Sequence, residues 1–182
     1  ITIASLGDMS NWGELSHTGR QLNAGCESTT RGIIGGGYGG KTPSDNSVVD
    51  TIQYITFASQ GNSEFFGSLS STRRNINAVS DKTRGVFIAG YDGSNTLNTI
   101  DYITMETTGN AVDFGDTTTV ILNGASVQNT TRGVYMGGQT PTYVNTIQYI
   151  TIQSTGNASD FGDLITANGN VPAGLCDING GF

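Results

Sequence analysis

Short apolar runs alternate with glycine-rich and polar turns along the whole chain. In the segment IQYITF (52–57), Ile52, Tyr54 and Thr56 fall on one face of an extended chain, and the intervening residues fall on the other. A period of two, rich in Ile, Thr and Tyr, is typical of a half-buried β-strand. No helical spacing continues for more than a few residues. The pattern therefore predicts an all-β protein.

Further strands are predicted where apolar runs end at glycines. One set follows an Arg-Gly pair, at residues 33–34, 86–88 and 134–136. Another set carries small residues and is expected on the outside of each sheet, at residues 22–26, 76–79 and 124–127. The Ser/Thr-Gly-Asn segments between strands are turn sequences, because Gly adopts positive φ readily.

The predicted strands recur as a tandem repeat of roughly 48 residues. Segments that begin at Ile1, Ile55, Ile103 and Ile150 superimpose without gaps, at spacings of 54, 48 and 47 residues. Each segment holds a Gly-Asn or Gly-Asp pair and then an aromatic residue followed by Gly. These repeated aromatic residues are Trp12, Phe66, Phe114 and Phe161. The resulting division is a partial unit at 1–15, units at about 16–69, 70–117 and 118–164, and a partial unit at 165–182.

A unit of this length with three or four strands fits a propeller blade, since the coils of a β-helix are much shorter. The order of features also resembles the kelch motif: an arginine, an apolar run ending in Gly-Gly, a Tyr-Asp-Gly turn and a strand with Tyr. GVFIAGYDG (85–93) matches that motif best. We therefore expect kelch-like repeats in a β-propeller-like fold. A four-bladed ring, in which residues 1–5 complete the blade begun by 166–182, and a larger or oligomeric propeller or fibre both remain open.

A second resemblance concerns the strings NTIDYIT (98–104) and STGNASDFGDL (154–164) and the Thr-Arg-Gly blocks. They are similar to repeat segments of virion proteins in marine bacteriophages, notably those infecting cyanobacteria. The chain also closes on Gly180-Gly181-Phe182, as such repeats often do. This resemblance implies a fibre, spike or head-surface protein of a virus particle. It implies other virion subunits, or a host-surface glycan or protein, as partners.

Composition narrows the set of partners. The formal net charge is −7, and the 8 basic residues form no stripe, which argues against a nucleic-acid partner. No apolar run is long enough to span a membrane. Two cysteines, Cys26 and Cys176, are too few for a disulfide framework or a zinc site. We expect buried free thiols, with a single bridge or a reactive role as alternatives.

No catalytic constellation is found. His17 is the only histidine, which argues against His-based triads and His-rich metal sites, and we expect it in a solvated turn. The prediction is a non-enzymatic protein with no metal and no cofactor. The arginines of the three Thr-Arg-Gly blocks, Arg31, Arg84 and Arg132, recur at one position. We expect them to support the scaffold, with a ligand-binding ring as the alternative.

The repeat breaks in one loop, between the Thr-Arg-Gly strand and the strand that follows it. From the arginine to the Asp or Asn that opens the next strand, the separations are 19, 14 and 13 residues. Variable loops on a repeated scaffold usually carry recognition. The candidate ligand-binding residues in these loops are Tyr38, Lys41, Asp45, Tyr91, Asp92, Asn95 and Tyr143. Aromatic, amide and carboxylate groups suit a carbohydrate or a protein surface, although the loops could meet only a neighbouring subunit or solvent.

The function expected from these observations is that of a virion structural or adhesion protein that displays the loops toward a host surface or another subunit. As part of an extracellular particle it would be a homo-oligomer or belong to a larger assembly. The alternative is a secreted, lectin-like β-propeller that binds carbohydrate. An enzyme on a propeller, with His, Tyr and Cys ligands around a metal, is disfavoured by the single histidine.

Overall fold

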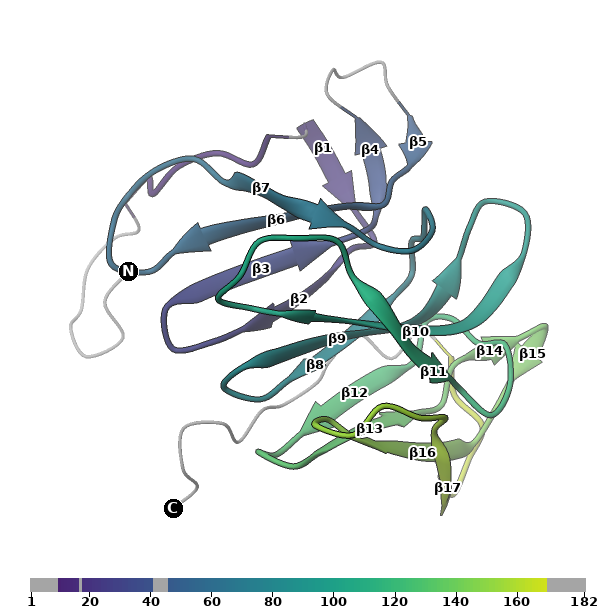
Figure 1. Ribbon diagram of the computed structural model, residues 1–182. Coiled ribbons are helices and arrows are strands. Elements are labelled where there is room, and N and C mark those ends of the chain that lie inside the picture. The colour runs from purple at the N-terminus through teal and green to yellow at the C-terminus, as the bar shows by residue number, and fades with distance from the viewer. Residues whose placement is uncertain (1–9, 17, 41–45, 170–182) are drawn as a thin grey trace.

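The computed structural model describes residues 10–16, 18–40 and 46–169 (Figure 1). Within these ranges the chain forms strands and turns and no helix. Three antiparallel sheets of four strands follow one another along the chain, and Figure 1 shows them as a row of blades. The prediction of an all-β, propeller-like fold is confirmed.

Each blade takes its four strands in chain order. The first blade comprises β2 (Ala24–Glu27), β3 (Arg31–Gly35), β6 (Thr51–Thr56) and β7 (Glu64–Ser68). The second comprises β8 (Asn77–Ser80), β9 (Arg84–Tyr91), β10 (Thr96–Thr104) and β11 (Val112–Asp116). The third comprises β12 (Ala125–Gln128), β13 (Arg132–Met136), β16 (Thr146–Thr151) and β17 (Ser159–Asp163).

Two small sheets extend the first and third blades. One joins β1 (Thr18–Gln21), β4 (Tyr38–Gly40) and β5 (Ser47–Val48). The other pairs β14 (Gln139–Thr140) with β15 (Thr142–Tyr143). The second blade makes the corresponding extension with the ends of β9 and β10, where Tyr91 pairs with Thr96.

The strands with small residues lie at the inner edges of the blades. β8 contacts both β2 and β12, so the three strands are neighbours at the centre. Gly25, Ala78 and Ser126 occupy one equivalent position there, and the Ser126 hydroxyl donates to the Ala78 carbonyl over 3.0 Å. The prediction that these are outer strands is therefore wrong. Small side chains are needed at the centre, where strands of successive blades converge.

The hydrophobic core lies between the blades. Between the first and second blades the buried residues include Ile33, Ile52 and Phe66 on one side and Phe87, Ile103 and Met105 on the other. Between the second and third they include Val86, Ile100 and Phe114 opposite Tyr135, Ile150 and Ile152. Each sheet thus buries its apolar face only because a neighbouring sheet covers it, as expected for a repeat protein.

A repeated hydrogen-bonded contact, which we call the clasp, joins the outer parts of successive blades. The Gly of a Gly-Asn turn donates its N–H to the carbonyl of the repeated aromatic residue in the unit before it. These bonds join Gly61 to Trp12 at 3.0 Å, Gly109 to Phe66 at 2.8 Å and Gly156 to Phe114 at 2.7 Å. The Asn Oδ1 accepts a second bond, from a backbone N–H two residues after the aromatic residue. These bonds join Glu14 to Asn62 at 3.0 Å, Ser68 to Asn110 at 3.1 Å and Asp116 to Asn157 at 3.0 Å.

The Gly that follows the aromatic residue is required by the clasp. A β-carbon at Gly67 would lie 2.0 Å from the carbonyl oxygen of Gly109, and one at Gly13 would lie 1.9 Å from that of Gly61. Two motifs that stand five residues apart within each unit therefore meet across the boundary between units.

An ion pair is fully buried in the second blade. The Arg73 guanidinium contacts the Asp101 carboxylate and also donates to the Thr99 carbonyl at 2.7 Å. Desolvation lowers the pKa of Arg73, and the charge of Asp101 opposes that shift. The third blade has Ile121 and Gln148 at the equivalent places, both buried, so the fold does not require the pair.

Candidate functional site

The hairpins between the second and third strands of each blade form one end of the propeller, which we call the loop end. Each hairpin also pairs with the residues just before an inner strand. These pairings are β1 with β4, Arg74 with Tyr91 and Leu122 with Gln139. The frame of the loop end is therefore the same in every unit, while the hairpins differ in length and composition.

Residues before the inner strands line the centre of the loop end in a left-handed conformation. Leu22, Asn75 and Asn123 have φ values of 58°, 55° and 59°. The Asn75 N–H donates to the Leu22 carbonyl at 2.8 Å, and the Asn75 side-chain amide donates to Asn123 Oδ1 at 2.5 Å. Asn tolerates this conformation well, whereas Leu does not.

Two of the candidate loop residues are joined by an arginine. The Arg74 guanidinium carbon lies 4.9 Å from the centre of the Tyr38 ring and 5.3 Å from the centre of the Tyr91 ring. Tyr38 belongs to the first blade and Tyr91 to the second, so the cation connects two blades. Such cation–π contacts contribute about 0.5–2 kcal/mol each.

Arg74 keeps its hydrogen-bonding capacity unused. Its guanidinium has no hydrogen-bond or ion-pair partner among the residues that the structure describes, and its Nε is buried. The backbone of Arg74 exchanges two hydrogen bonds of 2.9 Å with Tyr91, which holds the backbones of the two residues side by side. Arg74 was not among the residues predicted to bind a ligand. The sequence signal that could have identified Arg74 is the Arg73-Arg74 pair, because the first and third units have Gln21 and Leu122 at the position of Arg74.

Of the other candidate residues, Asp92, Asn95 and Tyr143 lie within the described ranges, and none of them contacts Arg74 through a hydrogen bond or an ion pair. Asp92 accepts the N–H groups of Ser94 at 2.7 Å and Asn95 at 2.6 Å, so it stabilises its own turn. Those bonds, chiefly that from Asn95, lower the pKa of Asp92. Tyr143 lies on the third blade with 53% of its surface exposed. Lys41 and Asp45 lie outside the described residues.

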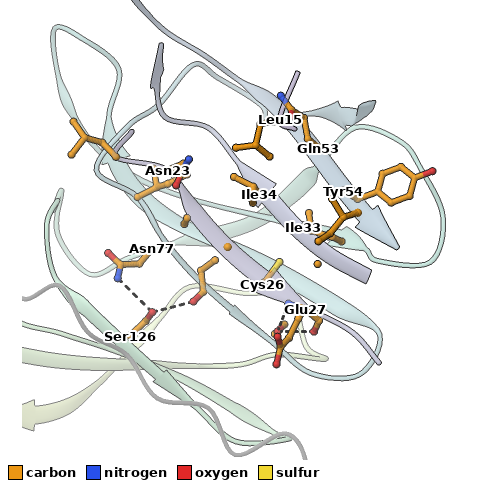
Figure 2. A pocket seen from close by; sticks show the side chains of 18 of the residues that line it. Leu15, Asn23, Cys26, Glu27, Ile33, Ile34, Gln53, Tyr54, Asn77 and Ser126 are labelled. Carbon is orange, nitrogen blue, oxygen red and sulfur yellow. Dashed lines mark hydrogen bonds between the residues drawn. The ribbon is translucent and has the colours of Figure 1, made fainter. Parts of the chain in front are cut away.

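A cavity of about 800 Å³ opens between the inner strands and one face of the first blade (Figure 2). Its apolar wall includes Leu15 and Ile34, and its polar wall includes Asn77 and Ser126. The Asn77 amide already donates to the Ser126 hydroxyl at 3.4 Å, so part of the polar wall links neighbouring blades.

Cys26 also borders the cavity, but its thiol is poorly suited to nucleophilic chemistry. A β-carbon on Gly85 of the second blade would lie 2.7 Å from its sulfur, which shows how closely that blade covers it. Burial, and secondarily the charge of Glu27, raises the pKa of Cys26 to about 12, so the thiol is protonated at neutral pH. Cys26 is a free thiol; Cys176 and His17 lie outside the described residues.

The Thr-Arg-Gly arginines lie at the end of the blades opposite the loop end. Each stacks on a tyrosine of its own blade: Arg31 on Tyr54 at 4.5 Å, Arg84 on Tyr102 at 4.2 Å and Arg132 on Tyr149 at 4.8 Å. Two of them also donate to a carbonyl of the next blade, Arg31 to Met105 at 2.9 Å and Arg84 to Ile152 at 3.0 Å. The same tyrosines meet Phe66, Phe114 and Phe161 edge to face.

The described residues were also compared with the requirements of a metal site and of a membrane-spanning helix. In the described part of the chain, no group of three or more His, Cys, Asp or Glu side chains could hold a metal ion. Over the same residues, no helix has the length and apolar character needed to cross a membrane.

Comparison with known proteins informs the fold. No protein-family model matches the sequence, and no curated protein matches it. The chain is similar to the solved structure of YjhT, a kelch-type propeller, with a TM-score of 0.68 and 8% sequence identity. The similarity covers 82% of this chain and 54% of that chain, so this chain spans about half the length of YjhT. At this identity the likeness establishes a propeller fold and no more.

Proposed function

We propose that this protein is a non-enzymatic structural or adhesion component of a virus particle, such as a phage fibre, spike or head-surface protein. In this proposal the repeated blades form the frame and assemble with neighbouring subunits. The loop end, with its unrepeated side chains, contacts the host surface or another subunit. The observation that carries the proposal is that, among the described residues, side chains at both ends of the row of blades are exposed where their counterparts are buried.

The first blade presents an apolar face that its counterparts bury. Phe57 is 41% exposed, whereas Met105 and Ile152, at the same position in the next two blades, are 0% exposed. Leu15, in the partial unit that precedes the first blade, is also 38% exposed, whereas its counterpart Leu69 is only 4% exposed. This face borders the cavity in Figure 2, so the cavity is the place where a preceding blade would pack.

Within the described residues, no Gly-Asn turn donates to the repeated aromatic residue of the third blade. Phe161 is 56% exposed, whereas Phe66 and Phe114 are each 2% exposed. A β-carbon at Gly162 would meet nothing within 4 Å, in contrast to the glycines of the three formed clasps. Apolar repeat faces need a neighbour to cover them, and we assign that neighbour to another subunit of the particle.

Assembly is tested with matched variants of residues 1–182. We expect the wild-type chain to form a defined oligomer by light scattering, and Phe57→Glu to disrupt it. Val120→Glu is the control, since Val120 is 42% exposed and lies in the segment between β11 and β12, outside the first blade. A monomeric wild-type chain, or equal disruption by both variants, contradicts the proposed assembly.

Location in the particle is tested separately. Antibodies raised against the purified chain should label intact virus particles by immunogold electron microscopy. Labelling confined to the culture fluid would instead favour the second candidate function, a secreted carbohydrate-binding propeller. The observation that favours this alternative is the cluster of Tyr38, Arg74 and Tyr91. In that case Tyr38→Ala or Tyr91→Ala should abolish binding in a glycan-binding assay.

A further inference from the structure

The cluster of Tyr38, Arg74 and Tyr91 is an exception within an otherwise repeated frame. The third unit forms the same backbone bridge with Leu122 and Gln139 in place of Arg74 and Tyr91. The fold therefore forms this backbone bridge without an arginine and without a tyrosine as its partner. A stacked cation between two aromatic rings is not explained by the needs of the scaffold.

The other arginines near the first two blade boundaries have acceptors. Arg20 donates to the Gly36 carbonyl at 2.7 Å, Arg73 pairs with Asp101, and Arg31 donates to the Met105 carbonyl. Arg74 alone among these four has no acceptor in the described residues. The ring contacts use no N–H group of Arg74, and the N–H edge of a guanidinium is the part that recognises a carboxylate in a bidentate manner.

Backbone and turn contacts surround Arg74 on both hairpins. The hairpins of the two blades lie close together, since a β-carbon at Gly93 would lie 3.5 Å from Val48. The nearby Asp92 carboxylate is engaged by the N–H groups of its own turn and makes no ion pair with Arg74. A site that is held in place in this way loses little conformational entropy on binding.

We propose that Arg74, held between Tyr38 and Tyr91, binds the carboxylate of an acidic saccharide at the loop end. The hydroxyls of Tyr38 and Tyr91 are the groups that would pair with sugar hydroxyls beside the carboxylate. The inference rests on the adhesive role proposed for the loop end, and it adds the chemical class of the ligand.

The test uses tri-galacturonate and its methyl ester, which has the same shape without the charge. By calorimetry or NMR titration of the whole chain, we expect the acid to bind at least about tenfold more tightly than the ester. Arg74→Gln should abolish that preference, and it should fold normally because the first unit carries Gln21 at this position. Arg132→Gln is the control: it removes the same charge from the opposite end of a blade and should leave binding unchanged.

Three results would overturn the inference: no binding of the acid, equal binding of the ester, or equal loss in the Arg132→Gln variant. Equally tight binding of tri-glutamate would also overturn it, since the site would then recognise acidic protein segments. Arg74→Gln should assemble as the wild-type chain does. Failure of the saccharide site is thus distinguishable from failure of the proposed assembly, which depends on Phe57.

Discussion

The backbone N–H of Gly109 donates to the carbonyl of Phe66 over 2.8 Å, and this bond ties the turn of one blade to the outer strand of the blade before it. The same contact occurs at three successive positions with nearly the same geometry. Stability of the whole chain should therefore depend on contacts between units as much as on the strands within each unit.

The two glycines of one clasp should respond differently to the same substitution. Gly67→Ala would place a β-carbon 2.0 Å from the Gly109 carbonyl oxygen, whereas Gly109→Ala would meet nothing within 4 Å. We expect Gly67→Ala to lower the free energy of unfolding by about 1–3 kcal/mol. Gly109→Ala should change it by about 0.5 kcal/mol or less. Urea unfolding measures both, and equal effects would show that the clasp is not rigid.

The buried pair of Arg73 and Asp101 can be replaced by the Ile and Gln that the third blade has at the equivalent positions. Arg73→Ile should cost about 3–5 kcal/mol, because Asp101 would be left as an unpaired buried carboxylate. Adding Asp101→Gln recreates the Ile121 and Gln148 arrangement of the third blade. The double variant should recover most of the loss in thermal unfolding. A double variant no more stable than Arg73→Ile would show that the two blades are not interchangeable here.

Leu22 is the exception among three left-handed residues at the centre of the loop end. Its φ is 58°, and 43% of its surface is exposed, so little burial is lost on substitution. Leu22→Asn should stabilise the protein by about 0.5–1 kcal/mol, because Asn adopts this conformation with less strain. The reciprocal change Asn123→Leu should destabilise it. The prediction fails if chemical denaturation gives the two variants shifts of the same sign.

Cys26 should resist thiol reagents in the folded protein. In a Cys176→Ser background at pH 8, we expect Ellman's reagent to react at least about 100-fold more slowly than in urea, because the folded thiol holds its proton. The thiol pKa rises from 9.0 to about 12 on folding. The unfolded chain therefore loses this proton first as pH rises, and folding stability should fall between pH 9 and about 12.

The control for the pH effect is Cys26→Val, because Val79 and Val127 occupy the same position in the other two blades. This variant should lack the part of the decline that Cys26 contributes, since it has no proton to release. Thermal unfolding at pH 8 and pH 10 measures the difference. If both proteins lose the same stability, the decline arises elsewhere.

Several features of the fold were predictable because they depend on neighbouring residues. The alternation at 52–57 predicts β6, and the apolar runs that end at glycines predict β3, β9 and β13. The inner position of the small-residue strands was not predictable in the same way. Whether a strand of Gly, Ala and Ser lies at the centre or the rim depends on which strand edges meet, and the same residues suit either place.

The candidate site likewise has residues that the sequence indicates and one that only the structure reveals. Variation among the loops is visible in the sequence and directs attention to Tyr38 and Tyr91. Arg74 is not visible as their partner, because it is 36 residues from Tyr38 and belongs to a segment between strands. The bridge that brings it between the two rings forms only when neighbouring blades pack together.

The strands, the turns and the period of the repeat follow from local patterns of apolar, polar and glycine residues, because such patterns act over a few bonds of one chain segment. Packing between blades sets the rest. It joins each Gly-Asn turn to the aromatic residue of the unit before it, and it brings Arg74 to Tyr38. It also buries Met105 while its counterpart Phe57 stays 41% exposed. These outcomes depend on which surfaces meet in space, and the pattern within one chain segment does not determine that.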